Sequence, residues 1–144
     1  MPTILHEVSI EAKPDVIYRA LTEEQGLRGW WTDHVQASPE LNSHSHFSFR
    51  SGHCKVKIEQ LVPQQRVEWI CVEQNVNGKS EWVDTRIRFE LSPLGDEMTL
   101  LVFTHENWKD KTEFFVHCNN RWGELICESL KNYCERGRGK PEIF

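Results

Sequence analysis

The C-terminal segment Lys111 to Arg136 most constrains the fold, because it predicts one long helix with a continuous buried face. Gly137 and Gly139 end this helix, and Pro141 prevents its return. Apolar or small side chains recur along it at spacings of three and four residues, namely Phe115, Cys118, Trp122, Leu125, Ile126, Ser129, Leu130 and Tyr133. A face of this length needs a broad partner to cover it.

The N-terminal third predicts a strand followed by two short helices. Side chains alternate between apolar and polar from Thr3 to Glu11, as one strand with a dominant apolar face requires. Pro14 suits the first turn of a helix, where its missing N–H costs nothing. Gly26 interrupts that helix, and a second short helix follows and carries Trp30 and Trp31.

The middle of the chain, from Val35 to His105, predicts a run of about six strands. Alternating segments are separated by turns, and Asn77-Gly78 is a strong hairpin signal. A run of strands followed by a helix indicates an α+β fold. We therefore expect one domain over residues 1–144, a helix-grip fold in which a curved antiparallel sheet of about six or seven strands wraps around the long C-terminal helix.

The Asn77-Gly78 turn also predicts which side chains face the helix. If the loop has two residues, Val76 faces Lys79, and opposed residues further out share a face. This register places Ile70, Val72, Val83, Thr85, Ile87 and Phe89 inside. Glu68 then points inward and Trp69 points outward. A bulge in either strand would reverse these faces, because a one-residue slip swaps them.

Composition narrows the compartment and the partners. The net charge is -5, which disfavours nucleic acid and acidic membrane surfaces. The five cysteines are odd in number and form no Cys-x-x-Cys, and no signal peptide or bilayer-length apolar stretch occurs. We expect a cytoplasmic protein with reduced thiols, no cofactor and no membrane insertion.

Several segments resemble the START-like (SRPBCC) superfamily, in particular the branch of the activator of heat-shock-protein-90 ATPase. They include the stretch from Ala12 to Trp31, the segment Ile87 to Pro93, the strand Thr99 to His105 and the pair Trp122-Gly123. Their order and spacing together imply the helix-grip fold, usually with a cavity between sheet and helix. Members of this superfamily bind lipids, sterols, hormones and polyketides, and some are cyclases, dehydratases or co-chaperones, so fold alone does not decide function.

The expected pocket lies between the inner face of the sheet and the long helix. Such sites are mostly apolar with a few placed polar groups. The side chains expected to line it are Trp31, Phe47, Phe49, Phe89, Phe103, His105, Phe115 and Trp122. The alternative is that these residues fill the space themselves.

Two polar residues are weak catalytic candidates, and four histidines are weak metal candidates. Glu68 and His105 could act as an acid–base pair if both faced the pocket. The alternative for His105 is a hydrogen bond to a backbone carbonyl near the strand end. His44 and His46 share a strand face, to which His34 or His53 could add a third ligand. This face is opposite to Phe47 and Phe49, so we expect exposure and no specific metal site.

Three functions are compatible with these features. The first is binding of a small hydrophobic or aromatic ligand in the cavity. The second is partnership with a chaperone, which only the family resemblance implies. The third is an enzyme of the cyclase or dehydratase kind that uses Glu68 or His105. We expect a monomer or a homodimer, and we rank an enzyme last.

Overall fold

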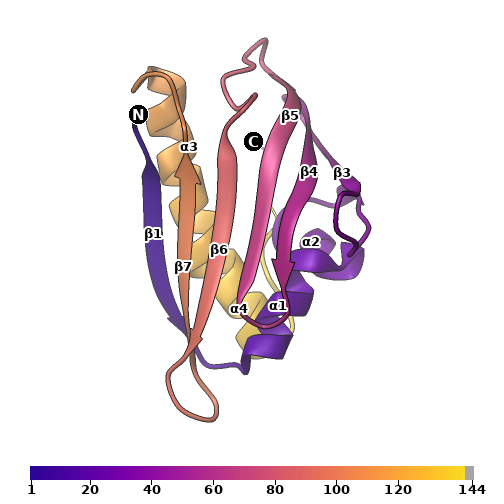
Figure 1. The fold of residues 1–144 in the computed structure, drawn as a ribbon, viewed down its shortest axis with the longest axis vertical. Coiled ribbons are helices and arrows are strands. Elements are labelled where there is room, and N and C mark those ends of the chain that lie inside the picture. The colour runs from indigo at the N-terminus through magenta and orange to yellow at the C-terminus, as the bar shows by residue number, and fades with distance from the viewer. Residues whose placement is uncertain (142–144) are drawn as a thin grey trace.

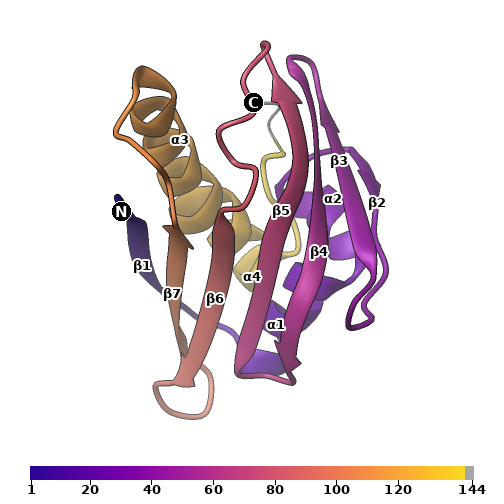
Figure 2. The same cartoon turned by 45° about the horizontal axis from the view of Figure 1, so that its top comes forward.

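The computed structural model describes residues 1–141, and its centre is a seven-stranded antiparallel sheet (Figures 1 and 2). The spatial order is β1-β7-β6-β5-β4-β3-β2. The strands are β1 (Ile4–Ile10), β2 (His34–Gln36), β3 (His44–Phe49), β4 (Gly52–Val62), β5 (Arg66–Val76), β6 (Arg86–Pro93) and β7 (Thr99–Glu106). The predicted α+β helix-grip fold is confirmed.

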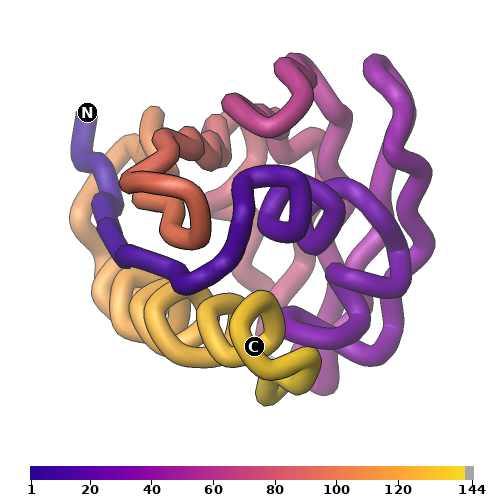
Figure 3. Tube along the Cα trace, turned by 90° about the horizontal axis from the view of Figure 1, so that it is seen from below, coloured from indigo at the N-terminus to yellow at the C-terminus, as the bar shows by residue number. Residues whose placement is uncertain are grey.

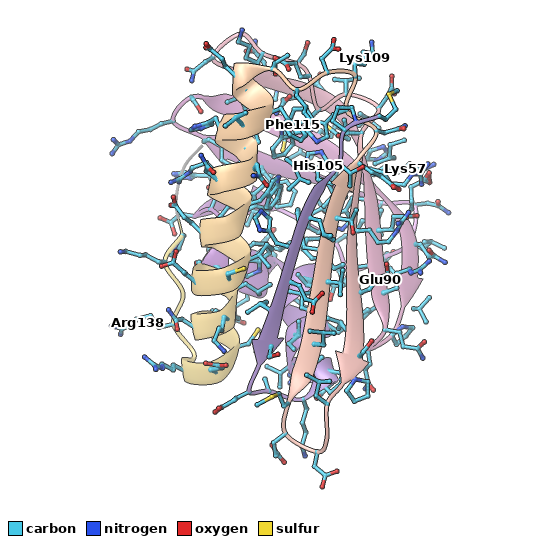
Figure 4. All side chains as sticks on the ribbon, turned by 90° about the vertical axis from the view of Figure 1, so that its left-hand side faces the viewer. Lys57, Glu90, His105, Lys109, Phe115 and Arg138 are labelled. Atoms are coloured by element: carbon cyan, nitrogen blue, oxygen red, sulfur yellow. The ribbon has the colours of Figure 1, made fainter. Side chains whose placement is uncertain are left out.

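One continuous helical rod covers the inner face of the sheet, as the apolar face of 111–136 predicts. It comprises α3 (Glu113–Glu124), a π-helical segment η1 (Leu125–Leu130) and α4 (Lys131–Arg136). Figure 4 shows this rod standing beside β1 and β7. Thr112 caps its start, because its Oγ1 accepts a hydrogen bond from the backbone N–H of Phe115 at 3.1 Å. Gly137, with φ of 81°, ends it in the left-handed conformation.

Two short helices, α1 (Pro14–Thr22) and α2 (Glu24–Trp30), connect β1 to the rest of the sheet. Figure 3 shows this indigo segment passing between the strands and the yellow C-terminal helix. The break between the helices falls at Glu23, not at Gly26 as predicted. Gly26 lies inside α2, where a Cβ would come within 2.6 Å of the Cα of Ala20. Trp30 ties the helices together, since its Nε1 donates to the carbonyl of Ala20 at 2.8 Å.

The predicted inward face of β5 is wrong, because a bulge shifts the register by one residue. Val76 does face Lys79. Further out, however, the single residue Cys71 exchanges hydrogen bonds with both Asp84 and Thr85. Asp84 has φ of 69°, the left-handed conformation that such bulges use. Residues 81–85 therefore form a turn rather than the start of a strand.

The extra residue reverses β5 but leaves β6 as predicted. Trp69 pairs with Ile87, and both are buried inside. Ile70 and Glu68 instead face outward, opposite Arg86 and Arg88. Val72, also predicted inside, is 40% exposed.

The core is aromatic, and all six tryptophans are buried. All five cysteines are free thiols. Across residues 1–141, no helix is long and apolar enough to cross a membrane.

Candidate functional site

The space between the sheet and the helix is filled by aromatic rings centred on Trp31. Its ring centroid lies 4.1 Å from that of Phe47 and 5.2 Å from that of Trp122. It also stacks on Trp69 at 6.1 Å. All four side chains are almost fully buried. The centre of the grip is therefore packed by the protein itself.

The eight residues predicted to line a ligand cavity come together in this cluster. None is more than 8% exposed. Phe103 shows the close packing, because its centroid lies 5.3 Å from that of Phe89 and 4.6 Å from that of Trp122. These side chains therefore meet in the interior, and their packing matches the alternative in which they fill the space themselves.

His105 lies inside this cluster as predicted, at the end of β7, and both of its ring nitrogens have partners. Trp122 Nε1 donates to His105 Nδ1 at 3.1 Å. Because an indole can only donate, Nδ1 carries no proton and Nε2 carries it. Nε2 therefore donates to Thr85 Oγ1 at 2.7 Å, and the Thr85 hydroxyl donates to the carbonyl of Trp82. The partners of His105 are therefore the side chains of Trp122 and Thr85, and not the backbone carbonyl that the alternative expected.

This environment keeps His105 neutral. Its side chain is completely buried, and burial lowers the pKa of its imidazole to about 3. Figure 4 shows His105 and Phe115 facing the same interior space from β7 and from the helix. With both nitrogens engaged and no solvent contact, the arrangement holds the core together and offers no mobile proton.

Glu68 lies on the opposite, outer face of the sheet, so its predicted inward position is wrong. Its carboxylate accepts hydrogen bonds from Arg88 Nε at 2.8 Å and from Arg86 Nη1 at 3.3 Å. The physical reason is that β5 changes faces between Gln74 and Cys71, where its pairing with β4 skips Val72, while Cys71 pairs with both Asp84 and Thr85 on the other side. Glu68 and His105 are therefore separated by the sheet and share no site.

The remaining reactive side chains are not gathered into a site either. His34, His44, His46 and His53 are exposed, and residues 1–141 contain no cluster of three or more metal-ligating side chains. Burial raises the pKa of every cysteine thiol, to about 12 for Cys71, Cys118 and Cys134. Buried thiols of this kind are poor nucleophiles.

A hollow that the sequence pattern does not indicate lies at one end of the grip, between the β5–β6 connection and the start of α3. Figure 2 shows this connection at the same end as the beginning of α3. We call the hollow between this connection and α3 the open-end hollow. Its volume is about 450 Å³, and it is lined by Ser80, Glu81, Val83, Asp84, Trp108, Lys109, Asp110 and Thr112.

A hydrogen bond between Glu81 and Thr112 forms one wall of the open-end hollow. Thr112 Oγ1 donates to Glu81 Oε1 at 2.6 Å, and the same Oγ1 caps α3. A second hollow of about 590 Å³ shares these two residues and extends past Phe114 and His117. The Glu81–Thr112 bond thus ties the β5–β6 connection to the helix and separates the two hollows.

The rim of the open-end hollow holds a strained backbone and a covered indole. Asp84 and Asn107 both have left-handed φ, of 69° and 76°, and Asn107 Nδ2 donates to the carbonyl of Asp84 at 3.5 Å. Strained conformations of this kind cluster at functional sites. Trp108 packs against His105 and Phe115 at centroid distances of 4.9 and 5.0 Å. Among residues 1–141, no acceptor reaches its buried Nε1.

Comparisons with solved structures agree with this fold. A bacterial structure described as the Aha1 dimer from Colwellia psychrerythraea is 34% identical, covers 96% of this chain and 100% of its own, and has a TM-score of 0.84. A protein from Mesorhizobium loti, at 17% identity and 87% and 91% coverage, has a TM-score of 0.73. A structure described as an HSP90 activator from Plasmodium falciparum, at 15% identity and 91% and 92% coverage, has a TM-score of 0.71. The last two show the fold alone.

A family model provides the assignment. No curated protein matches the chain. The model described as Activator of Hsp90 ATPase homolog 1-like protein matches residues 11–135, which is most of the sequence. The resemblance seen in the opening helices, the later strands and the long helix is thereby confirmed. The chain belongs to the family of Activator of Hsp90 ATPase homolog 1-like proteins.

Proposed function

We propose that this domain binds a small apolar or aromatic molecule in the open-end hollow. The observation that carries the proposal is the hollow itself. It has a volume of about 450 Å³, lies between the β5–β6 connection and the start of α3, and has the indole of Trp108 in its lining. Ligand sites typically measure about 300–1,000 Å³ and combine apolar walls with a few polar groups. The packed aromatic centre supports placing the ligand at this end rather than in the middle of the grip.

Native mass spectrometry of freshly purified protein and an NMR titration test this proposal. We expect a co-purifying small mass, or shifts confined to the amides of Val83, Lys109 and Thr112 when isopropylbenzene or acetophenone is added. Ser80→Trp should fill the hollow and weaken binding. The matched control is Ser92→Trp, at an exposed position outside the hollow. An absence of both a co-purifying mass and shifts with either probe would contradict the proposal.

A second candidate function is partnership with an Hsp90-class chaperone. Membership of the family over residues 11–135 favours it, and so does the 34% identical relative that is described as an Aha1 protein. The test adds the purified chain to the Hsp90-class chaperone of the same organism and measures the ATPase rate and co-precipitation. Stimulation or capture supports this function, and no change in either removes it.

We also propose that the chain forms a homodimer and works in the cytoplasm. The relative from Colwellia psychrerythraea is described as a dimer and matches 96% of this chain. Five free cysteines suit a reducing compartment. Sedimentation velocity at micromolar concentration should give twice the monomer mass, and a monomer would contradict the dimer. Fractionation of cells expressing a tagged chain tests the location.

A further inference from the structure

We propose that the molecule bound in the open-end hollow carries an uncharged hydrogen-bond acceptor, such as a ketone or amide carbonyl, and that Trp108 Nε1 donates a hydrogen bond to it. This inference rests on the proposed binding function and adds the chemical class of the ligand. It follows from three features: a covered indole N–H without an acceptor, neighbours that cannot supply one, and the charge of the lining.

The unpaired donor of Trp108 differs from three other indole N–H groups of this core, and among the described residues the buried Nε2 of Gln74 shares its state. Trp30 Nε1 donates to Ala20, Trp122 Nε1 donates to His105, and Trp82 Nε1 lies 3.4 Å from the sulfur of Cys118. Trp108 is 1% exposed, yet its Nε1 has no acceptor in residues 1–141. Buried donors without a partner are rare in native proteins, and each calls for a specific explanation.

The rings around Trp108 cannot provide the missing acceptor. The imidazole of His105 lies closest, at a centroid distance of 4.9 Å, but its Nδ1 already accepts from Trp122 and its Nε2 donates to Thr85. Phe114 and Phe115, at 6.2 and 5.0 Å, carry no acceptor atoms. An acceptor from outside the protein would enter through the hollow that Trp108 helps to line.

The lining favours an acceptor without charge. The lining holds three carboxylates, from Glu81, Asp84 and Asp110, and one ammonium group, from Lys109. Like charges disfavour an anionic ligand in such a site. A carbonyl oxygen accepts a hydrogen bond without this repulsion, and the aromatic faces near Trp108 suit an apolar body.

Access requires a small movement of the loop that carries Trp108. Neighbouring atoms cover Nε1, so a ligand reaches it only when the segment 107–112 shifts. This segment has no regular secondary structure, and it begins at Asn107, which has left-handed φ. The hydrogen bond between Thr112 and Glu81 lies at the C-terminal end of this segment.

Three probes of equal size test the inference: acetophenone, isopropylbenzene and benzoate. They share a phenyl ring and nine heavy atoms, and differ in carrying a neutral acceptor, no acceptor or a charged acceptor. NMR titration gives each affinity, and the indole ¹H–¹⁵N signal of Trp108, assigned by its loss in Trp108→Phe, reports on Nε1 directly. We expect acetophenone to bind about tenfold more tightly than the other two, the factor expected for one hydrogen bond, and to shift the Trp108 indole proton downfield.

Trp108→Phe keeps an aromatic ring but loses the N–H together with the pyrrole part of the indole, so the comparison is made within the variant, where acetophenone should bind no more tightly than isopropylbenzene. If Trp108→Phe does not fold, the indole signal is assigned through its NOEs to the rings of His105 and Phe115, and its shift in the natural protein decides alone. Equal binding of acetophenone and isopropylbenzene with an unmoved indole signal would overturn the inference and leave the binding function standing. Preferential binding of benzoate would also overturn it. Binding of none of the three, together with the absence of a co-purifying mass, would remove the proposed function itself.

Discussion

Trp122 on the long helix donates a hydrogen bond through Nε1 to Nδ1 of His105 on β7, at 3.1 Å, and thereby joins the two layers of the fold. This bond selects the tautomer of His105, whose Nε2–H donates a hydrogen bond to Oγ1 of Thr85, just before β6. A polar relay in the middle of an aromatic core is fully paired, and such networks hold a unique arrangement of side chains.

Acid should destabilise the protein through His105. Burial lowers the pKa of this imidazole to about 3 in the folded chain, against about 6.5 in the unfolded chain. Between these values the unfolded chain binds the proton and the folded chain does not, so stability is fully present above pH 6.5 and is lost as the pH falls toward 3. One such proton gives a slope of up to about 1.4 kcal/mol per pH unit.

Urea unfolding of the natural protein and of His105→Gln, at pH 7, 6, 5 and 4, measures this effect. The stability advantage of the natural protein should shrink as the pH falls, because glutamine does not titrate. His53→Gln, at an exposed position, serves as the control and should follow the natural protein. A difference between His105→Gln and the natural protein that stays constant with pH would contradict the assignment.

Trp122→Phe should destabilise the fold by about 2–4 kcal/mol, since it leaves the Nδ1 acceptor of His105 unpaired and opens a small void beside Trp31. Thermal or urea unfolding measures the loss. The histidine ring signals in NMR provide a second readout, because without the indole donor the tautomer of His105 is no longer held. An unfolding midpoint within error of the natural protein would mean that the relay contributes little.

The order of elements could be predicted from the sequence, but the face of β5 could not. Periodicity is a local property, and it located the helix from 111 to 136 and the strand run. On β5, however, Ile70 and Val72 are as apolar as Trp69 and Cys71, so the pattern does not choose between the faces. Val72, which the pairing with β4 skips, and the extra residue at Asp84 together decided the matter. Aspartate tolerates left-handed φ, so this position carried a weak signal.

The aromatic cluster was predictable because buried aromatic side chains on inward positions must meet somewhere. The open-end hollow was not, since loops build it and the chain around Trp108 has no periodicity. The two partners of His105 are Thr85, just before β6, and Trp122 on α3, which lie 20 and 17 residues away along the chain. Only the tertiary structure brings these residues into contact. The local sequence pattern therefore could not predict them, and it left a backbone carbonyl as the expected partner.

Glu68→Gln should cost about 1–2 kcal/mol of stability. Its carboxylate, 10% exposed, balances the charges of Arg86 and Arg88 on the outer face of the sheet. Removing this carboxylate takes away one partner of each arginine, while Glu59 still pairs with Arg86 and Glu106 with Arg88. These remaining pairs and the solvent that reaches both arginines limit the loss. Glu97→Gln is the control, because its pair with Lys13 is exposed and should contribute close to nothing. Equal effects of the two variants in urea unfolding would argue against the pairing.

Thr112→Ala should weaken both the start of α3 and the wall of the open-end hollow. The hydroxyl caps the helix through Phe115 and donates to Glu81, so its loss should cost about 1–2 kcal/mol in urea unfolding. Hydrogen exchange should rise together at the amides of Phe115 and of residues 79–83, because the same oxygen atom holds both segments. Thr112→Ser keeps the hydroxyl and should preserve both protections. If exchange rises at the helix start alone, the bond to Glu81 does not hold the β5–β6 connection, and the two hollows are not separated by it.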